Sequence, residues 1–359
     1  MMKTIFPILS HVTYVDTASS CIISEELHAW RKKHEEEFFE HGSRFRIEQG
    51  SFLESVRKTV KDFFNAKHAF LVPNFSLAFN SFLETLGPEE RFLLLDEEYP
   101  SISHPVEARG FPTSHVVVDG NIEERIYQAV KEHAPLVFAF SLVQYIDGFA
   151  LGLDFIKQLK KDFPDLLLVA DGTQYCGAGS LDFADSGLDV LAGSGYKWLL
   201  GGYGNGYILF GDQIYGRINE KLSKVKISEE YQARGKGAVD AHFEPGHLDT
   251  LNFGSLQQSL LSLTSFGMDQ IEKQVKTLSL QAKEAFTELS LLDEVIVQRS
   301  ETSSIFNIKG GRALFELLTN ENVICTPRGK GIRISFHFFN TKDDLNKILQ
   351  IIGENISTS

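Results

Sequence analysis

A carboxylate and a lysine, each following a buried apolar run, are the residues of this sequence best placed to do chemistry. Asp171 ends the run 166–170, and Lys197 follows a second apolar stretch and a few small residues, 26 positions further on. An apolar run of this kind is typical of a central strand in a parallel sheet. Ligands of open α/β sheets bind beyond the carboxyl ends of the strands, so we expect Asp171 to lie beside a ligand.

An acid at a strand end together with a lysine on a loop of small residues suits pyridoxal 5'-phosphate (PLP). The lysine amine would form a Schiff base with the cofactor aldehyde, and the acid would keep the ring nitrogen protonated, so that the ring accepts electrons. Gln174 would lie near the same ring and could donate to its phenolic oxygen. Taken singly, Asp171 and Lys197 are more simply a strand end and a surface loop, and it is the ordered pair that favours the cofactor.

The segment resembles the class V aminotransferases, a family of fold-type I PLP-dependent enzymes that holds cysteine desulfurases, kynureninase and isopenicillin-N-epimerase-like proteins. That family carries an Asp-x-x-Gln strand end and then a Ser-Gly-(His/Tyr)-Lys-Trp loop. This chain has Asp-Gly-Thr-Gln at 171–174 and Ser-Gly-Tyr-Lys-Trp at 194–198. The resemblance implies that Lys197 is catalytic and that the cofactor is also bound by Asp171, Gln174, Ser194 and Tyr196.

A predicted strand at 68–73 that turns into a predicted helix at 77–86 is a candidate anion site. Free backbone N–H groups at a helix N-terminus attract phosphate. In the family this turn binds the cofactor phosphate, and here it holds Asn74, Phe75 and Ser76. The family usually has a threonine where Phe75-Ser76 stands, and a plain serine N-cap is the alternative interpretation.

Two other strand ends are expected to contact the cofactor. Tyr99 follows a predicted strand at 91–96 and could stack on a pyridine ring, as aromatic or histidine residues do in the family. The predicted strand 136–143 leads into a segment where the family places a polar residue near the phenolic side of the cofactor. Gln144 is the candidate for that position, with Tyr145 as the alternative.

Arg333 alternates with apolar residues along a predicted C-terminal strand, where a guanidinium needs an anionic partner. A structural ion pair would satisfy it, but the family has Arg-x-Ser-x-x-x-Tyr-Asn here, and this chain differs from that motif only at Phe339. The resemblance implies that Arg333 holds the substrate α-carboxylate. It also implies that small residues near the N-terminus, among them Ala18, line the substrate pocket, unless they form an ordinary strand and turn.

The sequence Phe-Glu-Pro-Gly-His at 243–247 corresponds to a Phe-Glu-x-Gly-Thr segment of the family. In the family that segment crosses a dimer interface, and its threonine touches the cofactor phosphate of the neighbouring subunit. His247 replaces the threonine, and an imidazole can also donate to phosphate. The resemblance therefore implies a homodimer with shared active sites.

Strands and helices alternate along the chain, which predicts a parallel sheet with helices on both faces. With the resemblance, the expected fold is α/β, of the PLP-dependent transferase-like kind: a mainly parallel seven-stranded sheet between helices and a smaller α+β C-terminal domain. Residues 1–21 are expected to pack with the small domain, 22–255 to form the large PLP-binding domain, and 256–359 the small one. The small domain would begin with a linking helix over 256–291, which Gly267 can interrupt. Strands are also expected at 116–119 and 295–299, whereas 213–236 shows only weak periodicity.

Composition excludes several classes of protein. A net charge of −13 argues against a nucleic-acid or anionic-membrane partner. No run of about 18 apolar residues exists to span a membrane, and the N-terminus is not a secretory signal. Three cysteines without metal-ligand spacing suit a reducing compartment, so we expect a cytoplasmic protein without a metal site.

The expected substrate is an amino acid whose carboxylate Arg333 holds and whose Cα proton Lys197 removes. Burial and the nearby cationic ring would keep that amine neutral. Transamination is the primary expectation, and a PLP-dependent C–S lyase, a cysteine desulfurase-like enzyme or an epimerase is the alternative. A desulfurase needs a reactive cysteine on a mobile loop, whereas Cys325 lies in an apolar run eight residues before Arg333, so we expect it to be a packing residue. A catalytically silent PLP-binding protein is the alternative that is not an enzyme.

Overall fold

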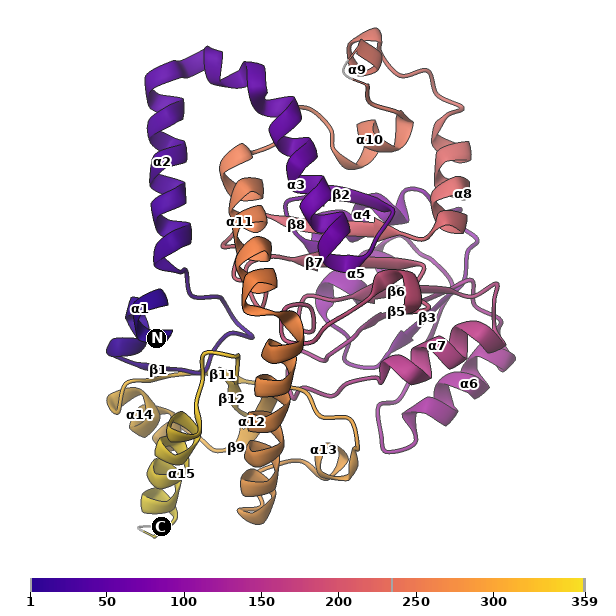
Figure 1. The fold of residues 1–359 in the computed structure, drawn as a ribbon. Helices are drawn as coiled ribbons and strands as arrows, with labels where there is room; N and C mark the ends of the chain where they lie inside the picture. The colour runs from indigo at the N-terminus through magenta and orange to yellow at the C-terminus, as the bar shows by residue number, and fades with distance from the viewer. Residues whose placement is uncertain (1, 234, 358–359) are drawn as a thin grey trace.

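A mainly parallel sheet of seven strands forms the centre of the larger part of the computed structural model, which describes residues 2–233 and 235–357 (Figure 1). The strand order is β2-β8-β7-β6-β5-β3-β4. Only β8 runs against its two neighbours, and the other neighbouring strands are parallel. This confirms the expected α/β fold. The strands are β2 (His68–Val72), β3 (Phe92–Leu95), β4 (Thr113–Val116), β5 (Val137–Ser141), β6 (Leu167–Asp171), β7 (Val190–Ser194) and β8 (Gly206–Phe210).

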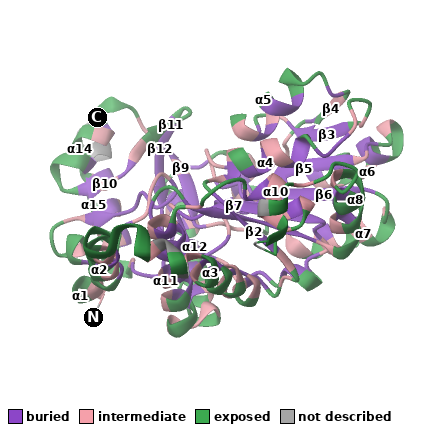
Figure 2. Cartoon of the chain, turned by 90° about the horizontal axis from the view of Figure 1, so that it is seen from above, coloured by how far each residue is buried: buried purple, intermediate pink, exposed green. Residues whose placement is uncertain are grey.

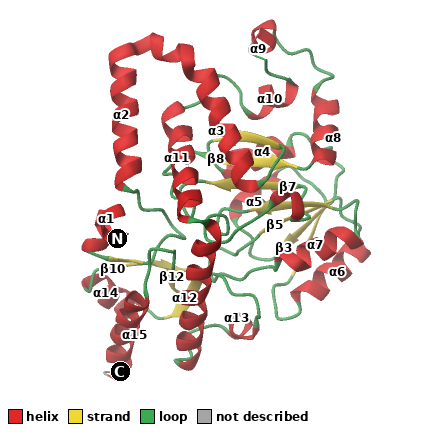
Figure 3. Cartoon of the chain, viewed as in Figure 1, coloured by secondary structure: helices red, strands yellow, loops and turns green. Residues whose placement is uncertain are grey.

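Side chains alternate between the two faces of this sheet, and each face has its own hydrophobic core. The strands β5, β6 and β7 are buried at every position, as their continuous apolar sequences predict. Figure 3 shows helices on both sides of the sheet, and Figure 2 shows buried strands inside more exposed helices. The first core includes residues of α3 (Gln49–Phe64), α6 (Ile122–His133), α7 (Leu153–Asp162) and α11 (Thr250–Phe266), and the second those of α4 (Phe75–Leu83), α5 (Pro100–Ala108), α8 (Asp212–Leu222) and α10 (Ala238–Phe243).

The C-terminal part is built on a small antiparallel sheet of the order β11-β12-β9. Near it, the N-terminal strand β1 (Thr13–Tyr14) pairs in parallel with β10 (Val323–Ile324) (Figure 1). This pairing supports our proposal that residues 1–21 pack with a C-terminal domain beginning near residue 256. The remaining elements here are β9 (Ile305–Lys309), β11 (Thr326–Arg328), β12 (Gly331–Ser335), α14 (Arg312–Asn320) and α15 (Lys342–Ser357).

Two consecutive helices, α11 and α12 (Met268–Glu288), run from the large sheet to the small one (Figure 1). Gly267 separates them with a φ of +86°, and its N–H bonds to the carbonyl of Leu263. A backbone in this region favours glycine. The break expected at Gly267 is therefore present.

Three local expectations need correction. Residues 295–299 were expected as a strand, but Glu294–Gln298 form the short helix α13, because the N–H groups of Ile296 and Val297 bond to the carbonyl of Asp293. The strand expected at 116–119 is β4, which ends at Val116. The weakly periodic stretch after residue 212 contains α8, which buries Ile214 and Ile218. Within the described residues, no helix combines the length and the apolar character that a membrane span requires.

Candidate active site

A cavity of about 270 Å³ lies beyond the carboxyl ends of β5, β6 and β7, whose last residues Ser141, Asp171 and Ser194 line it. This is the edge of the sheet at which ligands of α/β folds bind. Residues from distant parts of the sequence meet here. The cavity is lined by ten residues that the sequence singled out: Asn74, Phe75, Ser76, Tyr99, Tyr145, Asp171, Gln174, Ser194, Tyr196 and Lys197.

Asp171 is a buried carboxylate on the cavity wall. It accepts the backbone N–H of Thr173 at 2.8 Å. Burial raises the pKa of Asp171 to about 6, although the hydrogen bonds from Thr173 and the charge of Lys197 oppose this shift. A cationic group placed against Asp171 would favour its ionised form.

Lys197 follows β7 and is also buried, with 7% of its surface exposed. Burial lowers the pKa of Lys197 to about 8, and the charge of Asp171 opposes that shift. The Nζ atom lies 5.8 Å from the ring centroid of Tyr99 and 5.5 Å from that of Tyr196. A lysine with this lowered pKa holds a larger neutral fraction near pH 7 than a solvated one, as a nucleophilic amine requires.

The glycine-rich stretch after Lys197 folds back on the lysine loop. Asn205 donates from Nδ2 to the carbonyls of Gly201 and Gly202 at 2.9 and 3.1 Å. The backbone carbonyl of Asn205 accepts the N–H of Gly195 at 2.9 Å. A Cβ atom at Gly195 would overlap Oδ1 of Asn205. The glycine before Tyr196-Lys197 is therefore needed for a close approach of the backbone.

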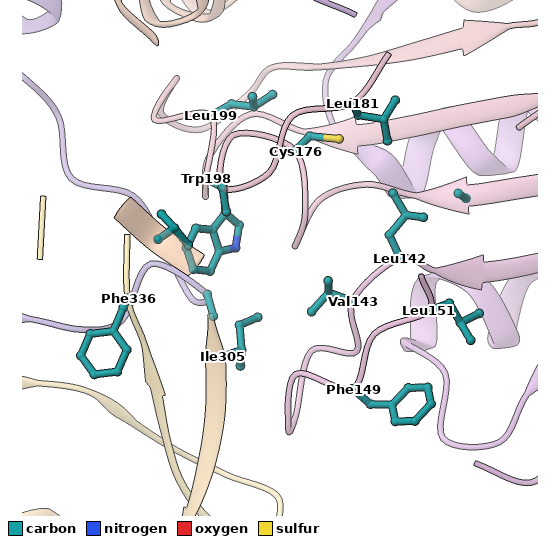
Figure 4. Packing of buried hydrophobic residues seen from close by; sticks show 14 of the residues in the cluster. Leu142, Val143, Phe149, Leu151, Cys176, Leu181, Trp198, Leu199, Ile305 and Phe336 are labelled. Carbon is teal, nitrogen blue, oxygen red and sulfur yellow. The ribbon is translucent and has the colours of Figure 1, made fainter. Parts of the chain in front are cut away.

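Gln174 ties the Asp171 strand end to the lysine loop. Its Oε1 accepts the indole N–H of Trp198 at 2.7 Å, and its Nε2 donates to the carbonyl of Ala18 at 3.0 Å. Trp198 packs between loops of the large sheet and the small sheet (Figure 4), among Val143, Cys176, Ile305 and Phe336. One N–H of the Gln174 amide is left for a ligand. Ala18 is fully buried and is not a lining residue.

The N-terminus of α4 forms another part of the wall. Asn74 caps this helix, since its Oδ1 accepts the N–H of Leu77 at 2.9 Å. Ser194 accepts the N–H of Phe75 at 2.9 Å, and Ser76 donates to Ser101 at 2.7 Å. Helix N-termini of this kind bind phosphate groups.

Gln144 is not among the residues that line the cavity, because both ends of its amide are used elsewhere. Its Nε2 donates to the carbonyl of Glu97 at 2.6 Å, and its Oε1 accepts the N–H of Ile146 at 2.7 Å. Tyr145, the alternative from the sequence, lines the cavity instead, with its ring 5.0 Å from that of Tyr99. The structure thus favours Tyr145 over Gln144 as the contact from this segment.

Arg333 lies next to the backbone of Tyr145, and only 1% of its surface is exposed. It donates from Nη1 to the carbonyl of Tyr145 at 2.6 Å and from Nη2 to Ser19, and Nη2 lies 3.9 Å from Asp16. Its Nε is buried and has no acceptor within the described residues. Burial lowers the pKa of Arg333 to about 10.

His247 lies outside this cavity. It is exposed between α10 and α11 and does not contribute to the lining in its own chain. The role expected for His247 is a contact with the cavity of a neighbouring subunit.

No role was expected for Glu98, which holds two lining residues of the cavity, Ser141 and Tyr99. This buried carboxylate accepts the backbone N–H of Ser141 at 2.8 Å, the Ser141 hydroxyl at 2.7 Å and the N–H of Tyr99 at 3.0 Å. Burial raises the pKa of Glu98 to about 7. Its place directly before Tyr99 at a strand end was the available signal. Tyr203, whose ring stacks on Tyr196 at 4.9 Å, is a further lining residue without a sequence prediction.

The cavity fits PLP in chemistry. It offers a partly neutral lysine amine to an aldehyde, a buried carboxylate to a ring nitrogen and a helix N-terminus to a phosphate. Arg333 is not among the lining residues, but its buried Nε has no acceptor within the described residues, and an anion would supply one. Within the described residues, no cluster of three or more His, Cys, Asp or Glu side chains could hold a metal ion.

The fold and the cavity together define a PLP-dependent enzyme of fold type I. Residues 18–348 match the Aminotransferase class-V family. The chain belongs to this family of enzymes, and this membership implies a PLP cofactor.

Two sequence relatives carry different activities in their names. The chain is 25% identical over 289 residues to the uncharacterized aminotransferase YcbU of Bacillus subtilis. The matched region covers 79% of this chain and 78% of that protein. It is 22% identical over 218 residues to the isopenicillin N epimerase of Amycolatopsis lactamdurans, covering 53% and 52%.

Two solved structures share the fold over almost the whole chain. A cysteine desulfurase of Thermococcus onnurineus superposes with a TM-score of 0.83 at 15% identity, covering 100% of this chain and 98% of that one. The cystine C–S lyase C-DES, in a mutant with glycine covalently linked to its PLP cofactor, superposes with a TM-score of 0.83 at 17% identity, covering 97% and 98%. At these identities the likeness establishes the fold.

Proposed function

We propose that the protein acts on the Cα atom of an amino acid and that Lys197 is the group that moves the Cα proton. The observation that carries this proposal is the buried Lys197 amine, whose pKa burial lowers to about 8, on the same cavity as Asp171. An amine with this pKa can both accept and return a proton near neutral pH. When bound, PLP supplies a ring that accepts the electrons of the bond broken at Cα.

Residues on the cavity wall would hold the cofactor. Asp171 would face the ring nitrogen, and Tyr99 would stack on the ring. Gln174 would donate its remaining amide N–H to the phenolic oxygen. The phosphate would bind at the N-terminus of α4, together with Ser194 and Tyr196, near Asn74, Phe75 and Ser76.

Arg333 would bind the α-carboxylate of the substrate. Its buried and unpaired Nε supports this role, since an acceptor would relieve the cost of an unsatisfied donor. Its Nη atoms already contact Tyr145 and Ser19, which fix the plane of the guanidinium. Ala18 would act behind the substrate, because its backbone N–H and carbonyl bond to Ser335 and Gln174.

Removal of the Cα proton is common to transamination, to β-elimination with C–S cleavage and to epimerisation. Transamination, the primary expectation from the sequence, is supported by the YcbU relative. C–S cleavage and epimerisation have the broader support, from the cystine C–S lyase and desulfurase structures and from the epimerase relative. We therefore propose all three outcomes as candidates, and the products of the reaction will distinguish them.

A desulfurase that carries sulfur on its own cysteine is the least favoured outcome. Cys325 is buried, and burial raises the pKa of its thiol to about 12. The chain between Cys325 and Arg333 is the tight hairpin β11–β12, in which Arg328 pairs with Gly331. Such a thiol is a poor nucleophile and has little freedom to reach a substrate.

We also propose a homodimer with shared active sites. Large apolar side chains are exposed on α2 (Glu25–His41) and just after it, since Phe38, Phe39 and Ile47 are 57%, 89% and 83% exposed. A second copy that covered them would remove apolar surface from water. In that assembly His247 would reach the cofactor phosphate of the partner. A cytoplasmic location is supported by the three cysteines, which are all free thiols.

A panel of amino acids tests the proposal. Purified protein with PLP is mixed with neutral, acidic and sulfur-containing amino acids and assayed for keto acid, ammonia, sulfide and the opposite enantiomer. At least one product is expected from the wild type and none from Lys197→Ala, whereas the control Lys157→Ala, at a half-exposed lysine that does not line the cavity, should keep full activity. Equal activity of Lys197→Ala and wild type would contradict the proposal.

A further inference from the structure

Two guanidinium groups contact the same lining residue, Tyr145. Arg333 donates to the Tyr145 carbonyl at 2.6 Å, and the central carbon of the Arg328 guanidinium lies 6.0 Å from the centroid of the Tyr145 ring. From this juxtaposition we propose that the substrate is an amino acid with an anionic side chain and that Arg328 binds that second anion. This inference rests on the proposed function, in which Arg333 binds the α-carboxylate.

Arg328 and Arg333 project from one face of the β11–β12 hairpin. Arg333 is paired with Thr326 across the hairpin, and Arg328 lies two residues beyond Thr326 on the same strand. Side chains two apart on a strand share a face, as do directly paired residues. The two arginines are thus diagonal neighbours, a relationship in which Cα atoms lie about 7–8 Å apart.

That face of the small sheet is directed at the cavity wall. Thr326 donates to Asp16 at 2.7 Å, next to Arg333. Asn307, which pairs with Arg333 on β9, donates from Nδ2 to the carbonyl of Arg328 at 2.7 Å and to that of Ile146 at 3.3 Å. The side-chain amide of Asn307 therefore holds the backbone of Arg328 close to Ile146, the residue that follows Tyr145.

Gly329 brings the hairpin still closer to this loop. It adopts a φ of +57°, and a Cβ atom there would lie 2.9 Å from Cγ2 of Ile146. The backbone that carries Arg328 is thus held in place, although the side chain itself is exposed. An exposed arginine is usually only a solvated charge, but the backbone of this one is held close to the loop of Tyr145, which lines the cavity.

The charges near the cavity leave Arg328 available for a ligand. Asp16 lies 3.9 Å from Nη2 of Arg333, and the charge of Arg328 also acts on this carboxylate, but no hydrogen bond or ion pair joins the Arg328 guanidinium to another described residue. The charge of Arg328 also acts on Lys197. Burial is the main cause of the lowered pKa of Lys197, and the charges of Arg333 and Arg328 lower it further.

A second carboxylate, or a sulfinate, which also spreads one negative charge over two oxygens, is the chemistry that Arg328 fits. A guanidinium presents paired N–H donors that match two oxygens of such a group. A charge-assisted hydrogen bond of this kind contributes about 1.5–3 kcal/mol, which corresponds to a roughly 10–100-fold effect on affinity. The expected substrates are therefore aspartate, glutamate and their relatives with short anionic side chains.

The test compares Arg328→Gln with Lys330→Gln, a variant at an exposed lysine of the same hairpin. For each PLP-loaded enzyme, kcat/KM is measured with glutamate, aspartate and alanine, and calorimetry gives the Kd of succinate and of butyrate. We expect Arg328→Gln to lower kcat/KM for the acidic substrates by about 10–100-fold, with alanine changed by less than about twofold. Succinate should bind more weakly by a similar factor and butyrate should be unaffected. Lys330→Gln should resemble the wild type, and Arg328→Lys should recover part of the loss.

Three results would overturn the inference. The first is wild-type enzyme that turns over alanine as efficiently as the acidic substrates, and the second is an equal loss for all substrates in Arg328→Gln. The third is unchanged succinate binding in that variant. If no amino acid of any class reacts, the proposed function fails instead, and the succinate titration alone decides whether Arg328 is an anion site.

Discussion

The indole N–H of Trp198 donates a hydrogen bond of 2.7 Å to the side-chain oxygen of Gln174. Both residues are buried, and each lies within three positions in sequence of a group that the proposed chemistry needs. Trp198 directly follows Lys197, and Gln174 closes the turn that begins at Asp171. The bond therefore joins the two loops whose relative position sets the distance between the amine and the carboxylate.

Trp198→Phe should destabilise the protein by about 1–3 kcal/mol, because it leaves the Gln174 oxygen buried without a donor. Chemical denaturation of the cofactor-free protein measures this loss. Trp30→Phe is a comparison at a half-buried indole, since Trp30 stacks on His34 at 4.9 Å and its indole N–H has no hydrogen bond to the described residues. Equal losses in the two variants would show that the Trp198 hydrogen bond contributes nothing beyond ring packing.

The rate at which PLP attaches to the cofactor-free protein should depend on pH with a midpoint near 8. Only the neutral amine attacks the aldehyde, and burial lowers the pKa of Lys197 to about 8. The rate should rise about tenfold per pH unit below this value and level off above it. Stopped-flow absorbance follows the reaction, with Nα-acetyllysine as the solvated control. A protein rate that keeps rising to pH 10, like that of the control, would disprove the lowered pKa.

Asp171→Asn should stabilise the cofactor-free protein by about 1–3 kcal/mol above pH 6. Burial raises the pKa of Asp171 from 3.8 to about 6, so the folded chain keeps a proton that the unfolded chain has already lost. The wild type thus loses stability as the pH rises from about 4 to about 6, and the amide does not.

Denaturation of both proteins between pH 4 and pH 8 measures this gap, which should open between pH 4 and 6 and stay constant above. The same variant should bind PLP more weakly, because the ring nitrogen loses its anionic partner. A variant less stable than the wild type at every pH would contradict the assigned cost of burying the Asp171 carboxylate.

Cys325→Ala should leave turnover within about twofold of the wild type and cost a modest amount of stability, since Cys325 is a buried packing residue. Sulfide release from cysteine, measured with a reductant present, is the assay. Cys176→Ala serves as a comparison, because Cys176 is also buried and burial raises the pKa of its thiol to about 12. If Cys325→Ala lost all sulfide release and Cys176→Ala did not, the protein would instead be a desulfurase that uses the Cys325 thiol.

Much of the fold could be predicted because its strands carry uninterrupted apolar sequences and its breaks carry glycine. The run before Asp171 is β6, and the break at Gly267 separates α11 from α12. Local signals failed where they were weak. The Val-Ile-Val sequence at 295–297 suggested a strand, but a single carbonyl, that of Asp293, closes a helical turn there.

The residues around the cavity were predictable where a motif named their place, and less so where side-chain direction decided. Lys197 and Asp171 both line the cavity. Gln144 and Tyr145 are neighbours in sequence, and only the bonds to Glu97 and Ile146 show that the Gln144 amide is used elsewhere. A position of Arg328 near Tyr145 could not be predicted from the sequence, because it depends on the register of the β11–β12 hairpin.

The measurement that tests the central claim most directly is borohydride reduction of the protein loaded with PLP, followed by peptide mass spectrometry. Reduction makes the bond between a lysine amine and the cofactor permanent, so the modified residue can be identified. We predict one pyridoxyl group per chain, on Lys197. An adduct on another lysine, or protein that takes up no cofactor at all, would contradict the assignment of Lys197 as the residue that performs the chemistry.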